Sequence, residues 1–507
     1  MFGVMSCAGL DGFGAKKVSV EADISRGLPA FLMVGLAENS VKESRVRVQS
    51  AISNAGFDFP RARISINLAP ADVQKHGTAF DLSIALAILL ATGVIAKSKV
   101  KGLAAIGELS LTGEVRPVRG MLALAESISD QGIKYLLVPK ENAAEAALIT
   151  NLQVKIVSSF QEVVEAIVQS KIDQLPDINP ASKAVLTTDG PDMVDVVGQE
   201  EARRALLIAA AGNHNMLLIG GPGSGKSMMA CRLPSILPPL CYQEALTLTK
   251  IYSIAGLTIS GNLIHDRPFR APHHSTTRAG LVGGGSGIVR PGEISLASFG
   301  VLFLDELLEF PRTVLEVLRQ PLENGEVTIS RASQHVTFPA DISLVAALNP
   351  CPCGNFGQKK GECKCSEMAI LKYQSRLSGP LIDRIDLHVN VPPVDLKLMA
   401  NAQGGESSSS MRDKVIKARR VQENRFKGST TNAKMSRPEI KRLAQLSPSA
   451  SAFLVRAAEK LRVSARGFDR IIRVARTIAD LGEEACIHEH HLAEALQYRP
   501  SPGLVRN

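Results

Sequence analysis

Eight consecutive residues of this sequence have the types and the spacing of a phosphate-binding loop. The segment Gly220–Ser227 reads GGPGSGKS and lies between the short apolar run Met216–Ile219 and a helix predicted to begin at Met228. It has the G-x-x-x-x-G-K-S pattern in the required strand–loop–helix context. Backbone N–H groups of such a loop surround phosphate oxygens, and the N-terminus of the following helix faces the same charge. The residues expected to form the loop are Gly220, Gly221, Pro222, Gly223, Ser224 and Gly225.

Two side chains at the end of this loop complete the expected nucleotide site. We expect the ammonium group of Lys226 to contact the β- and γ-phosphates of ATP and the hydroxyl of Ser227 to ligate Mg²⁺. A chance glycine turn is a poor alternative, because every fixed position of the pattern is present in its proper context. The sequence therefore predicts ATP and Mg²⁺ as ligands.

A pair of acidic residues follows a second apolar run. Val301–Leu304 has the composition of a buried central strand and is followed by Asp305 and Glu306. The carboxyl end of such a strand is where α/β sheets bind ligands. We expect Asp305 to hold Mg²⁺ through water and Glu306 to polarise the attacking water. Acids after a strand usually form a solvated turn, but the phosphate-binding loop in the same chain favours the catalytic interpretation.

Two further polar features lie in the same part of the chain. Asn349 ends the next predicted strand, Ile342–Leu348, and could orient water near the γ-phosphate. The alternative for Asn349 is a turn residue before Pro350, and the residues alone do not decide between the two. His273 and His274 have no nearby third ligand, so we expect local hydrogen bonds rather than a metal.

Four of the eight cysteines lie in one short segment and form two C-x-C pairs separated by nine residues. These are Cys351, Cys353, Cys363 and Cys365. Four thiolates suit a tetrahedral Zn²⁺, and such a site would be structural because no coordination position stays open. An iron–sulfur cluster uses the same ligand set, and four reduced thiols are the remaining alternative. The isolated cysteines, which we interpret as core thiols, are Cys7, Cys231, Cys241 and Cys486.

The whole-chain composition limits the elements that can position these residues. The 507 residues correspond to roughly three domains, and 45% apolar with 21% charged residues is typical of a chain with buried cores. A net charge of +9 permits a polyanionic partner without requiring one. The longest apolar run, Leu82–Ala96, predicts a buried helix, because a membrane span needs about 20 apolar residues. The N-terminus lacks a signal-peptide pattern, so we expect a cytoplasmic protein without membrane contact.

Changes in composition divide the chain into segments. Residues 1–170 mix predicted strands, such as 18–24, with predicted helices at 41–55 and 82–90, which indicates an α+β or α/β domain. The rest is predicted to comprise a linker at 171–191, an α/β core at 192–395 with the cysteine loop at 351–365, a flexible joint at 401–410 and a helical domain at 411–507.

Further segments resemble one family of P-loop ATPases. The order of the phosphate loop, the acid pair and Asn349 resembles the Walker A, Walker B and sensor 1 motifs of an AAA+ ATPase. The segments FRAPHHSTT, NPCPCG and RLSGPLIDRID, which begin at Phe269, Asn349 and Arg376, resemble the magnesium-chelatase-like branch, and the YifB/ComM family in particular. The resemblance covers essentially the whole chain. It implies a P-loop AAA+ α/β core with a C-terminal helical lid, assembled as a homohexameric ring that hydrolyses ATP.

The family resemblance also implies an activity. ComM proteins are DNA helicases that promote branch migration during natural transformation, so an ATP-dependent DNA helicase acting in homologous recombination is implied here. Arg384 corresponds to the arginine finger, which would stabilise transition-state charge at the γ-phosphate held by the neighbouring subunit. From the residues alone, a salt bridge of Arg384 to Asp383 or Asp386 is the alternative. The sensor 2 arginine is best matched by Arg466, with Arg470 and Arg473 as alternatives.

Three arginines are candidate DNA contacts. Residues 322–338 are predicted to form two short strands around a polar tip with Arg331, and the resemblance to minichromosome maintenance helicases implies that this hairpin enters a central pore. Arg278 and Arg290 flank a glycine-rich segment that resembles the helix 2 insertion of chelatase-type proteins and is a second candidate pore loop. Contacts with phosphate require charge and carry no base specificity. A solvent-exposed hairpin is the alternative.

The N-terminal domain resembles the C-terminal fold of Lon proteases, which is also found in RadA. The segment GELSLTGEVRPV, which begins at Gly107, carries the resemblance. The serine and lysine of the Lon dyad fall at Ala79 and near Leu122, neither of which can act as nucleophile or base. Thr78 and Ser83 are close to the serine position, but residues 102–133 contain no lysine. We therefore expect a catalytically inactive domain that serves binding or ring assembly.

Two interpretations share the ATPase core. The first is a ring motor that moves on branched or single-stranded DNA. The second is a magnesium-chelatase-type motor that remodels a protein partner, and such motors usually lack the Lon-like domain and the four-cysteine loop. An ATP-dependent protease is a third interpretation, which the missing dyad disfavours. The sequence favours the first.

Overall fold

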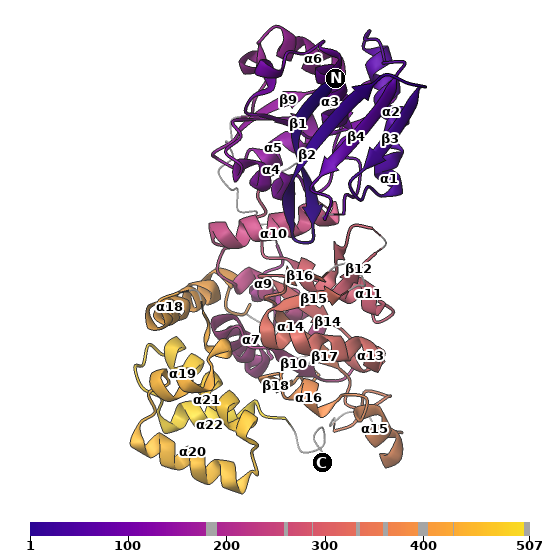
Figure 1. Cartoon of the computed structure of the whole chain (residues 1–507). Helices are drawn as coiled ribbons and strands as arrows, with labels where there is room; N and C mark the ends of the chain where they lie inside the picture. Colours follow the sequence, from indigo (N-terminus) through magenta and orange to yellow (C-terminus); the bar gives the residue numbers. More distant parts are fainter. Residues whose placement is uncertain are drawn as a thin grey trace.

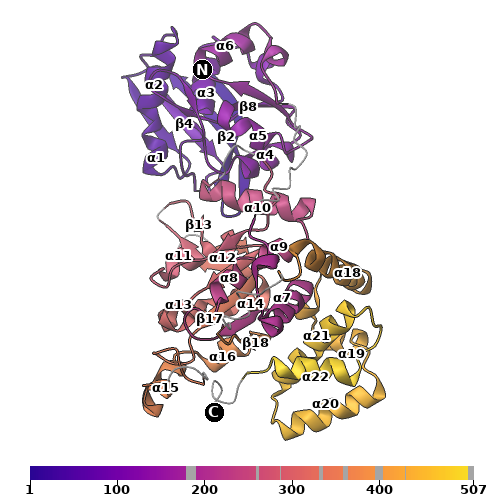
Figure 2. The ribbon, with the colours of Figure 1, turned by 180° about the vertical axis from the view of Figure 1, so that it is seen from behind.

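The computed structural model has three parts that follow one another along its length (Figure 1). The N-terminal part lies at the top of that view, the part with the phosphate loop in the middle and a helical C-terminal part at the bottom. Figure 2 shows the same arrangement from behind. The structure describes residues 1–72, 74–178, 190–257, 262–285, 287–330, 335–357, 363–393, 404–428 and 430–500. Within these ranges, no helix has the length and apolar character needed to span a bilayer.

The N-terminal part is built on a mixed seven-stranded sheet with the strand order β3-β4-β2-β1-β5-β8-β9. β1 and β2 form a long antiparallel hairpin whose register runs from the pair Phe2–Asp23 to the pair Asp11–Gly14. The strand predicted at 18–24 is part of β2 and is confirmed. The strands are β1 (Phe2–Asp11), β2 (Gly14–Ser25), β3 (Ala30–Val34), β4 (Arg63–Ala69), β5 (Leu103–Ala105), β8 (Tyr135–Pro139) and β9 (Gln153–Val157), with a separate pair β6 (Glu108–Leu109) and β7 (Val115–Arg116).

Helices pack against this sheet, and one of them is almost entirely buried. α3 (Asp81–Thr92) has eleven buried residues and ends at Gly93, whose φ of +83° suits a helix C-cap. The helix predicted at 82–90 is therefore confirmed, whereas the apolar run to Ala96 is not helical throughout, because the helix ends at Thr92. The helix predicted at 41–55 is in fact two helices, because Glu43 interrupts it. The remaining helices of this part are α1 (Asn39–Lys42), α2 (Ser44–Asn54), α4 (Met121–Ser129), α5 (Lys140–Ala146) and α6 (Phe160–Val168).

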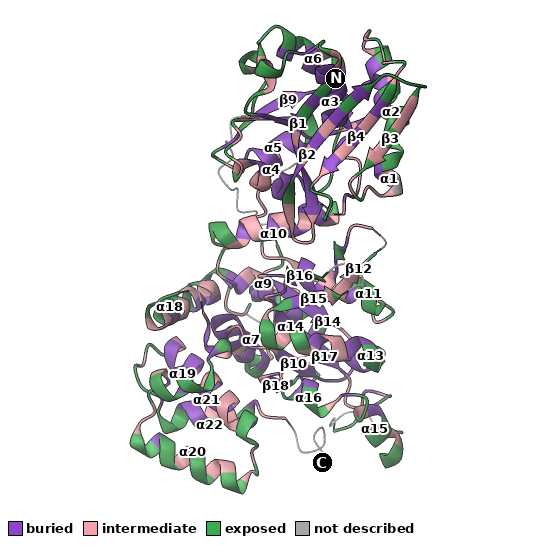
Figure 3. Cartoon of the chain, in the orientation of Figure 1, coloured by how far each residue is buried: buried purple, intermediate pink, exposed green. Residues whose placement is uncertain are grey.

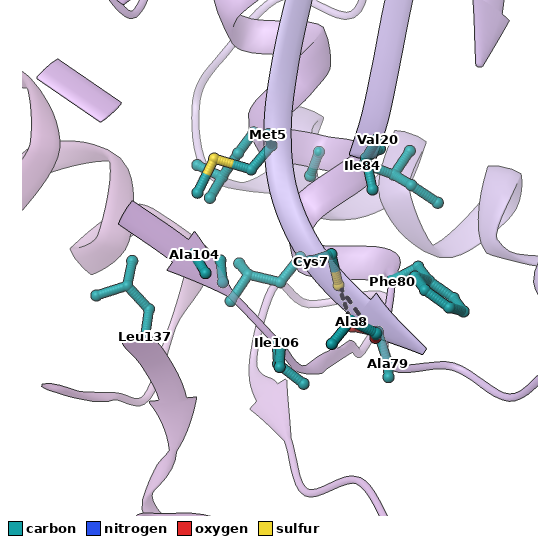
Figure 4. Packing of buried hydrophobic residues seen from close by; sticks show 14 of the residues in the cluster. Met5, Cys7, Ala8, Val20, Ala79, Phe80, Ile84, Ala104, Ile106 and Leu137 are labelled. Carbon is teal, nitrogen blue, oxygen red and sulfur yellow. Dashed lines mark hydrogen bonds between the residues drawn. The ribbon is translucent and has the colours of Figure 1, made fainter. Parts of the chain in front are cut away.

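Cys7 lies in the centre of this core, among Met5, Phe80 and Ile84 (Figure 4). Its thiol contacts the backbone carbonyls of Ala8 and Ala79, and burial raises its pKa to about 11. The interpretation as a core thiol is therefore confirmed for Cys7. It is wrong for Cys241 and Cys486, which are exposed, and Cys231 is only half-buried. Cys241 is the N-cap residue of α10, and Cys486 lies in the segment between α21 and α22.

The middle part contains a five-stranded parallel sheet with the order β11-β14-β17-β10-β18. Its three central strands are buried along their whole length, as expected for strands covered on both faces. The predicted α/β fold class is thus confirmed for a parallel sheet with helices around it. The strands are β10 (Met216–Ile219), β11 (Phe269–Arg270), β14 (Val301–Leu304), β17 (Ser343–Leu348) and β18 (Leu387–Asn390), with the hairpins β12 (Gly283–Gly284)–β13 (Arg290–Pro291) and β15 (Glu326–Ser330)–β16 (His335–Pro339).

The strand order decides where the site must lie. β17 lies between β10 and β14 and runs parallel to both. The carboxyl ends of these three strands therefore meet at one edge of the sheet. The helices of this part are α7 (Glu200–Gly212), α8 (Lys226–Ala230), α9 (Leu233–Ile236), α10 (Tyr242–Ala255), α11 (Arg278–Val282), α12 (Glu293–Leu296), α13 (Arg312–Leu315), α14 (Arg319–Asn324), α15 (Glu367–Gln374) and α16 (Gly379–Ile382).

The C-terminal part is helical, and its first helix begins earlier than predicted. α18 begins at Ser408, because the side chain of Ser407 accepts a hydrogen bond from the Ser410 N–H and caps the helix. Residues 408–410 of the predicted flexible joint are thus the first turn of a helix, and residues 401–403 lie outside the described ranges. The helices are α18 (Ser408–Phe426), α19 (Arg437–Leu443), α20 (Pro448–Lys460), α21 (Ala465–Leu481) and α22 (Glu489–Gln497). Figure 3 shows that α20 is largely exposed.

The N-terminal part packs directly on the middle part through α10. The Gly120 N–H donates to the Ser253 carbonyl at 3.2 Å, and the Ser253 hydroxyl donates to the buried carboxylate of Glu145. The ring of Phe13, at the β1–β2 turn, meets the ring of Phe338 edge-on at 6.1 Å. Val336 and Phe338 of β16 belong to the same apolar cluster as the N-terminal core. One continuous core therefore crosses the boundary between the two parts.

Candidate active site

The phosphate-binding loop connects the end of β10 to α8. Gly223 and Gly225 have φ values of +72° and +89°, in the left-handed region that residues other than glycine rarely adopt. At Gly220 a Cβ atom would lie 2.3 Å from the Val391 carbonyl oxygen, so a side chain has no room there. α8 begins at Lys226, two residues earlier than predicted. The helix N-terminus therefore starts at the lysine and faces the loop.

Lys226 is buried against the loop. Its ammonium group donates hydrogen bonds to the carbonyl oxygens of Gly220, at 2.7 Å, and Gly221, at 2.8 Å. A third contact, at 3.4 Å, reaches Oδ1 of Asn349 at the end of β17. Burial lowers the pKa of Lys226, and the carboxylates of Asp305 and Glu306 oppose that shift. The structure thus brings together the predicted lysine and the predicted polar residue of the neighbouring strand.

Ser227 and Asp305 lie in direct contact. The Ser227 hydroxyl donates to Oδ2 of Asp305 at 2.6 Å, and Oδ1 of Asp305 accepts the Glu306 N–H at 2.9 Å. A hydroxyl beside a carboxylate offers the oxygen ligands that Mg²⁺ prefers, so these two residues fit that ion. A cavity of about 350 Å³ lies between the loop and the ends of β14 and β17. The predicted site residues that line it are Pro222, Gly223, Ser224, Gly225, Lys226, Ser227, Asp305, Glu306 and Asn349.

His274 is a site residue that the sequence interpretation missed. Its Nδ1 lies 3.4 Å from Oε2 of Glu306, and its ring meets the edge of Phe310. The expectation of local hydrogen bonds holds for His273, whose Nδ1 lies 2.9 Å from the Ser275 hydroxyl. For His274 it is wrong. β11 pairs in parallel with β14, so the residues that follow the two strands lie at the same edge of the sheet, where His274 contacts Glu306. Sequence spacing gives no signal for such a contact.

The four cysteines converge on one point beside the phosphate loop. The Sγ atoms of Cys351, Cys353, Cys363 and Cys365 all lie within 4.8 Å of one another, and three of the separations are 3.4, 3.6 and 3.7 Å. Tetrahedral Zn²⁺ with Zn–S bonds of about 2.3 Å would place its ligands roughly 3.8 Å apart, so the four thiols fit zinc. A Cβ atom at Gly354 would lie 2.5 Å from Cδ of Pro222. The cysteine loop therefore packs directly on the phosphate loop.

The predicted finger and sensor arginines lie in a different cavity, of about 390 Å³, between the middle and C-terminal parts. Arg384 forms an ion pair with Glu323 at 2.6 Å, rather than with Asp383 or Asp386. Arg466 lies 4.0 Å from Asp383, and Arg470 donates to the Ile385 carbonyl at 2.7 Å. The structure does not bring these arginines to Lys226. The cavity's arginines are Arg384, Arg466, Arg470 and Arg473.

The structure describes two of the three arginines that were predicted to contact DNA. Arg278 begins α11 and Arg290 lies in β13, and both are exposed. The antiparallel pair β15–β16 matches the predicted hairpin, but residues 322–324 belong to α14, so the hairpin is shorter than predicted. Arg331 lies outside the described residues.

The positions that match the Lon dyad carry no such chemistry. Ala79 is buried, and so is Leu122. The Ser83 hydroxyl donates to the Ala105 carbonyl at 2.6 Å, whereas Thr78 bonds to the carboxylate of Glu108. The nearby ammonium group of Lys75 contacts the Pro70 carbonyl. Each of these hydroxyl and amino groups thus has a hydrogen-bond partner.

A second cluster, Glu484, His490 and His491, lies at the start of α22. Nδ1 of His491 accepts the His488 N–H at 3.0 Å, which leaves the proton of a neutral ring on Nε2, facing Glu484. A ring in that state has no free lone pair for a metal. We interpret the cluster as a helix cap.

Comparisons with known proteins cover nearly the whole chain. The family described as magnesium chelatase, subunit ChlI, matches residues 192–399, and two further chelatase models match residues 20–142 and 405–499. Competence protein ComM of Haemophilus influenzae is 43% identical over 98% of this chain and 97% of its own length. The uncharacterized protein YifB of Escherichia coli is 41% identical over 97% of this chain and 96% of its own. DNA replication licensing factor mcm6 of Dictyostelium discoideum is a more distant match, 25% identical over 38% of this chain and 20% of its own length.

Proposed function

The chain belongs to the YifB/ComM family of magnesium-chelatase-like AAA+ ATPases, and from that premise we propose that it is a ring-forming motor that hydrolyses ATP to move on branched or single-stranded DNA. The observation that carries the ATPase assignment is the meeting of Lys226, Ser227 and Asp305 at the carboxyl ends of β10 and β14, with Asn349 at the end of β17 between them. Within this scheme the chain acts in homologous recombination of transforming DNA, in the cytoplasm.

The proposed chemistry assigns each residue one task. Lys226 binds the β- and γ-phosphates, and its buried ammonium group gains a strong partner there. Ser227 and Asp305 supply oxygen ligands for Mg²⁺, which when bound neutralises phosphate charge. Glu306 accepts a hydrogen bond from the attacking water and its proton during attack, and the Asn349 side chain orients that water. His274 holds the Glu306 carboxylate in place.

We further propose that each nucleotide-binding site is completed by residues of a neighbouring copy of the chain. Four arginines, Arg384, Arg466, Arg470 and Arg473, line the cavity away from Lys226. Their guanidinium groups are the candidates for contact with a γ-phosphate on an adjacent subunit. This supports a homohexamer in which Arg384 is the arginine finger and Arg466 the sensor 2 arginine, reaching the nucleotide in trans.

Several observations support DNA as the polymer. The net charge is +9, the relative from Haemophilus influenzae is named a competence protein, and a part of the chain is similar to a DNA replication factor. Arg278, Arg290 and Arg331 are the proposed phosphate contacts. Branch migration and helicase activity follow from the same proposal. The four-cysteine loop is proposed to hold structural Zn²⁺.

A strand-displacement assay tests the proposal directly. Purified protein is incubated with a three-way DNA junction with and without ATP, and Lys226→Ala serves as the matched control. We expect ATP-dependent branch movement with the wild type and none with Lys226→Ala. ATP hydrolysis without any DNA binding at low salt would instead favour a magnesium-chelatase-type motor that remodels a protein partner, in line with the description of the matching family. Absence of ATP hydrolysis would overturn both.

A further inference from the structure

A pocket on the N-terminal part combines aromatic rings with unpaired arginines. We propose that this pocket binds an unstacked base of single-stranded nucleic acid and that the surrounding arginines hold the phosphates on either side of it. The inference rests on the proposed movement along DNA and adds a strand-binding site outside the ATPase core. Nothing in the ATPase mechanism uses these residues.

The pocket, of about 550 Å³, lies between the edge strand β3, helix α2 and the segment that connects α2 to β4. Phe31, Phe57 and Phe59 line it, and each ring is half-buried, with its inner side packed on the N-terminal core. Gln49 and Ser53 of α2 also line the pocket and are exposed. The pocket thus offers flat apolar faces for stacking and polar groups that can hydrogen-bond to a base edge.

Two arginines line this pocket, together with one acid. Arg45 and Arg61 are exposed, and neither forms an ion pair with an acid anywhere in the described ranges. Asp58 is exposed as well. The guanidinium of Arg45 lies over the ring of Phe31, 5.9 Å from its centroid. Arg47, two residues further along the same helix, is by contrast paired with Asp81 at 2.6 Å. Of the two arginines of α2, the one that lines the pocket is therefore the one without an acidic partner.

This combination favours a nucleic acid strand over other occupants. Proteins that bind single strands use basic grooves to follow the backbone and aromatic side chains to stack bases. Two chain segments contribute the pocket arginines, namely α2 and the segment that connects α2 to β4. Successive phosphates of a strand can each pair with one of these charges.

The edge of the N-terminal part that carries the pocket also contacts a candidate pore loop. Gly287, in the loop between Arg278 and Arg290, lies close to Glu38. A Cβ atom added at Gly287 would be 3.2 Å from the Glu38 carboxylate. Glu38 lies four residues after the end of β3 and directly precedes α1. Figure 1 shows α1 and β3 above α11 and β12 on the same side of the molecule. The N-terminal part therefore borders that loop on the side that carries β3.

The test compares two double variants of the full-length chain. Arg45→Ala/Arg61→Ala removes two charges at the pocket, whereas Lys17→Ala/Arg116→Ala removes two exposed charges elsewhere on the N-terminal part. Binding of a 2-aminopurine-labelled oligo(dT) is measured across salt concentrations. We expect the pocket variant to lower the salt slope by about 1.4, as for two single-strand phosphate contacts, and the control to match the wild type. ATPase activity without DNA should be unchanged in both.

A variant that weakens stacking and a mononucleotide ligand distinguish a nucleic acid strand from the other possible occupants of the pocket. Phe31→Leu should weaken oligo(dT) binding roughly tenfold and reduce quenching of 2-aminopurine, and free dTMP should bind far more weakly than the oligonucleotide. The inference is overturned if dTMP binds as well as the strand. It is also overturned if the pocket variant loses ring assembly instead of DNA affinity, since a neighbouring subunit then fills the pocket. If wild type binds DNA and all pocket variants bind equally well, only this inference fails. Failure of the wild type to bind any DNA removes the proposed function as well.

Discussion

At the residue scale, Glu306 is distinguished by its backbone as well as by its carboxylate. It has a φ of +49°, which a residue with a side chain adopts at a cost in conformational energy. This conformation turns the carboxylate out of the strand direction, and 56% of the side chain is exposed at the cavity. A replacement that keeps the shape of the side chain therefore tests its charge alone.

Glu306→Gln should abolish turnover while ATP remains bound. The amide cannot accept a proton from water, so we expect hydrolysis to fall by about 10²- to 10⁴-fold. Single-turnover hydrolysis and binding of a fluorescent ATP analogue measure the two steps separately. Glu309→Gln is the matched control, because Glu309 pairs with Arg376 rather than lining the cavity. Hydrolysis by Glu306→Gln at the wild-type rate would remove Glu306 from the mechanism.

His274→Ala should slow hydrolysis without weakening nucleotide binding. The ring contacts the Glu306 carboxylate and no residue of the phosphate loop in the described contacts. We expect the maximal rate to fall roughly tenfold, within the range for one positioned group, while the KM for ATP stays the same. His273→Ala removes the adjacent ring, which bonds to Ser275, and serves as the control. Equal rates for the two variants would contradict the assigned role.

At the scale of elements, the contact between the cysteine loop and the phosphate loop is open to a matched test. Gly354 and Gly357 both have positive φ, of +80° and +75°, so alanine strains the backbone at either position. Only at Gly354 would the new Cβ clash with Pro222, whereas at Gly357 it would meet nothing within 4 Å. We expect Gly354→Ala to weaken ATP binding more than Gly357→Ala, with metal content unchanged in both. Isothermal titration with ATP, alongside metal analysis, measures this, and equal affinities would argue against coupling of the loops.

The four-cysteine loop should carry close to one zinc atom per chain. We expect Cys351→Ser to lose most of the zinc, because Cys351 is fully buried and its Sγ contacts two of the other three thiols. Soluble yield should fall with it, since metal binding of this kind is coupled to folding. Elemental analysis of protein purified without added zinc checks the prediction. Iron with visible absorbance, or protein without metal, would contradict it.

Sequence patterns predicted the elements whose signals are local. The strand–loop–helix order around Lys226 and the buried run before Asp305 can be read from a few consecutive residues. The contact of His274 with Glu306 and that of Gly354 with Pro222 could not be predicted, because they depend on the order of strands in the sheet. The start of α18 was predicted too late, since the serine run that suggested flexibility also provides the N-cap. Serine is favoured both at helix N-caps and in turns and loops, so the residue type alone does not distinguish the two.

At the scale of the whole molecule, mixed rings test whether Arg384 acts on a neighbour. Arg384→Ala subunits keep Glu306 but lack the finger, and Glu306→Gln subunits keep the finger but lack the carboxylate. We expect each variant alone to be inactive, whereas mixtures should recover part of the ATPase activity at interfaces that combine both intact residues. Steady-state hydrolysis across mixing ratios measures this recovery. No recovery in rings that contain both variants would place Arg384 outside the neighbouring site.

The apolar cluster that joins the N-terminal core to β16 has a consequence for how the chain melts. Ile254, Val289, Val336 and Phe338 are buried together with residues of the first sheet. Neither part can lose its fold without exposing apolar surface that belongs to the other, and exposure of such surface costs about 25 cal/mol per Å². In a calorimeter the N-terminal and middle parts should therefore share one endotherm. A fragment that starts after the linker would carry a bare hydrophobic face and should aggregate.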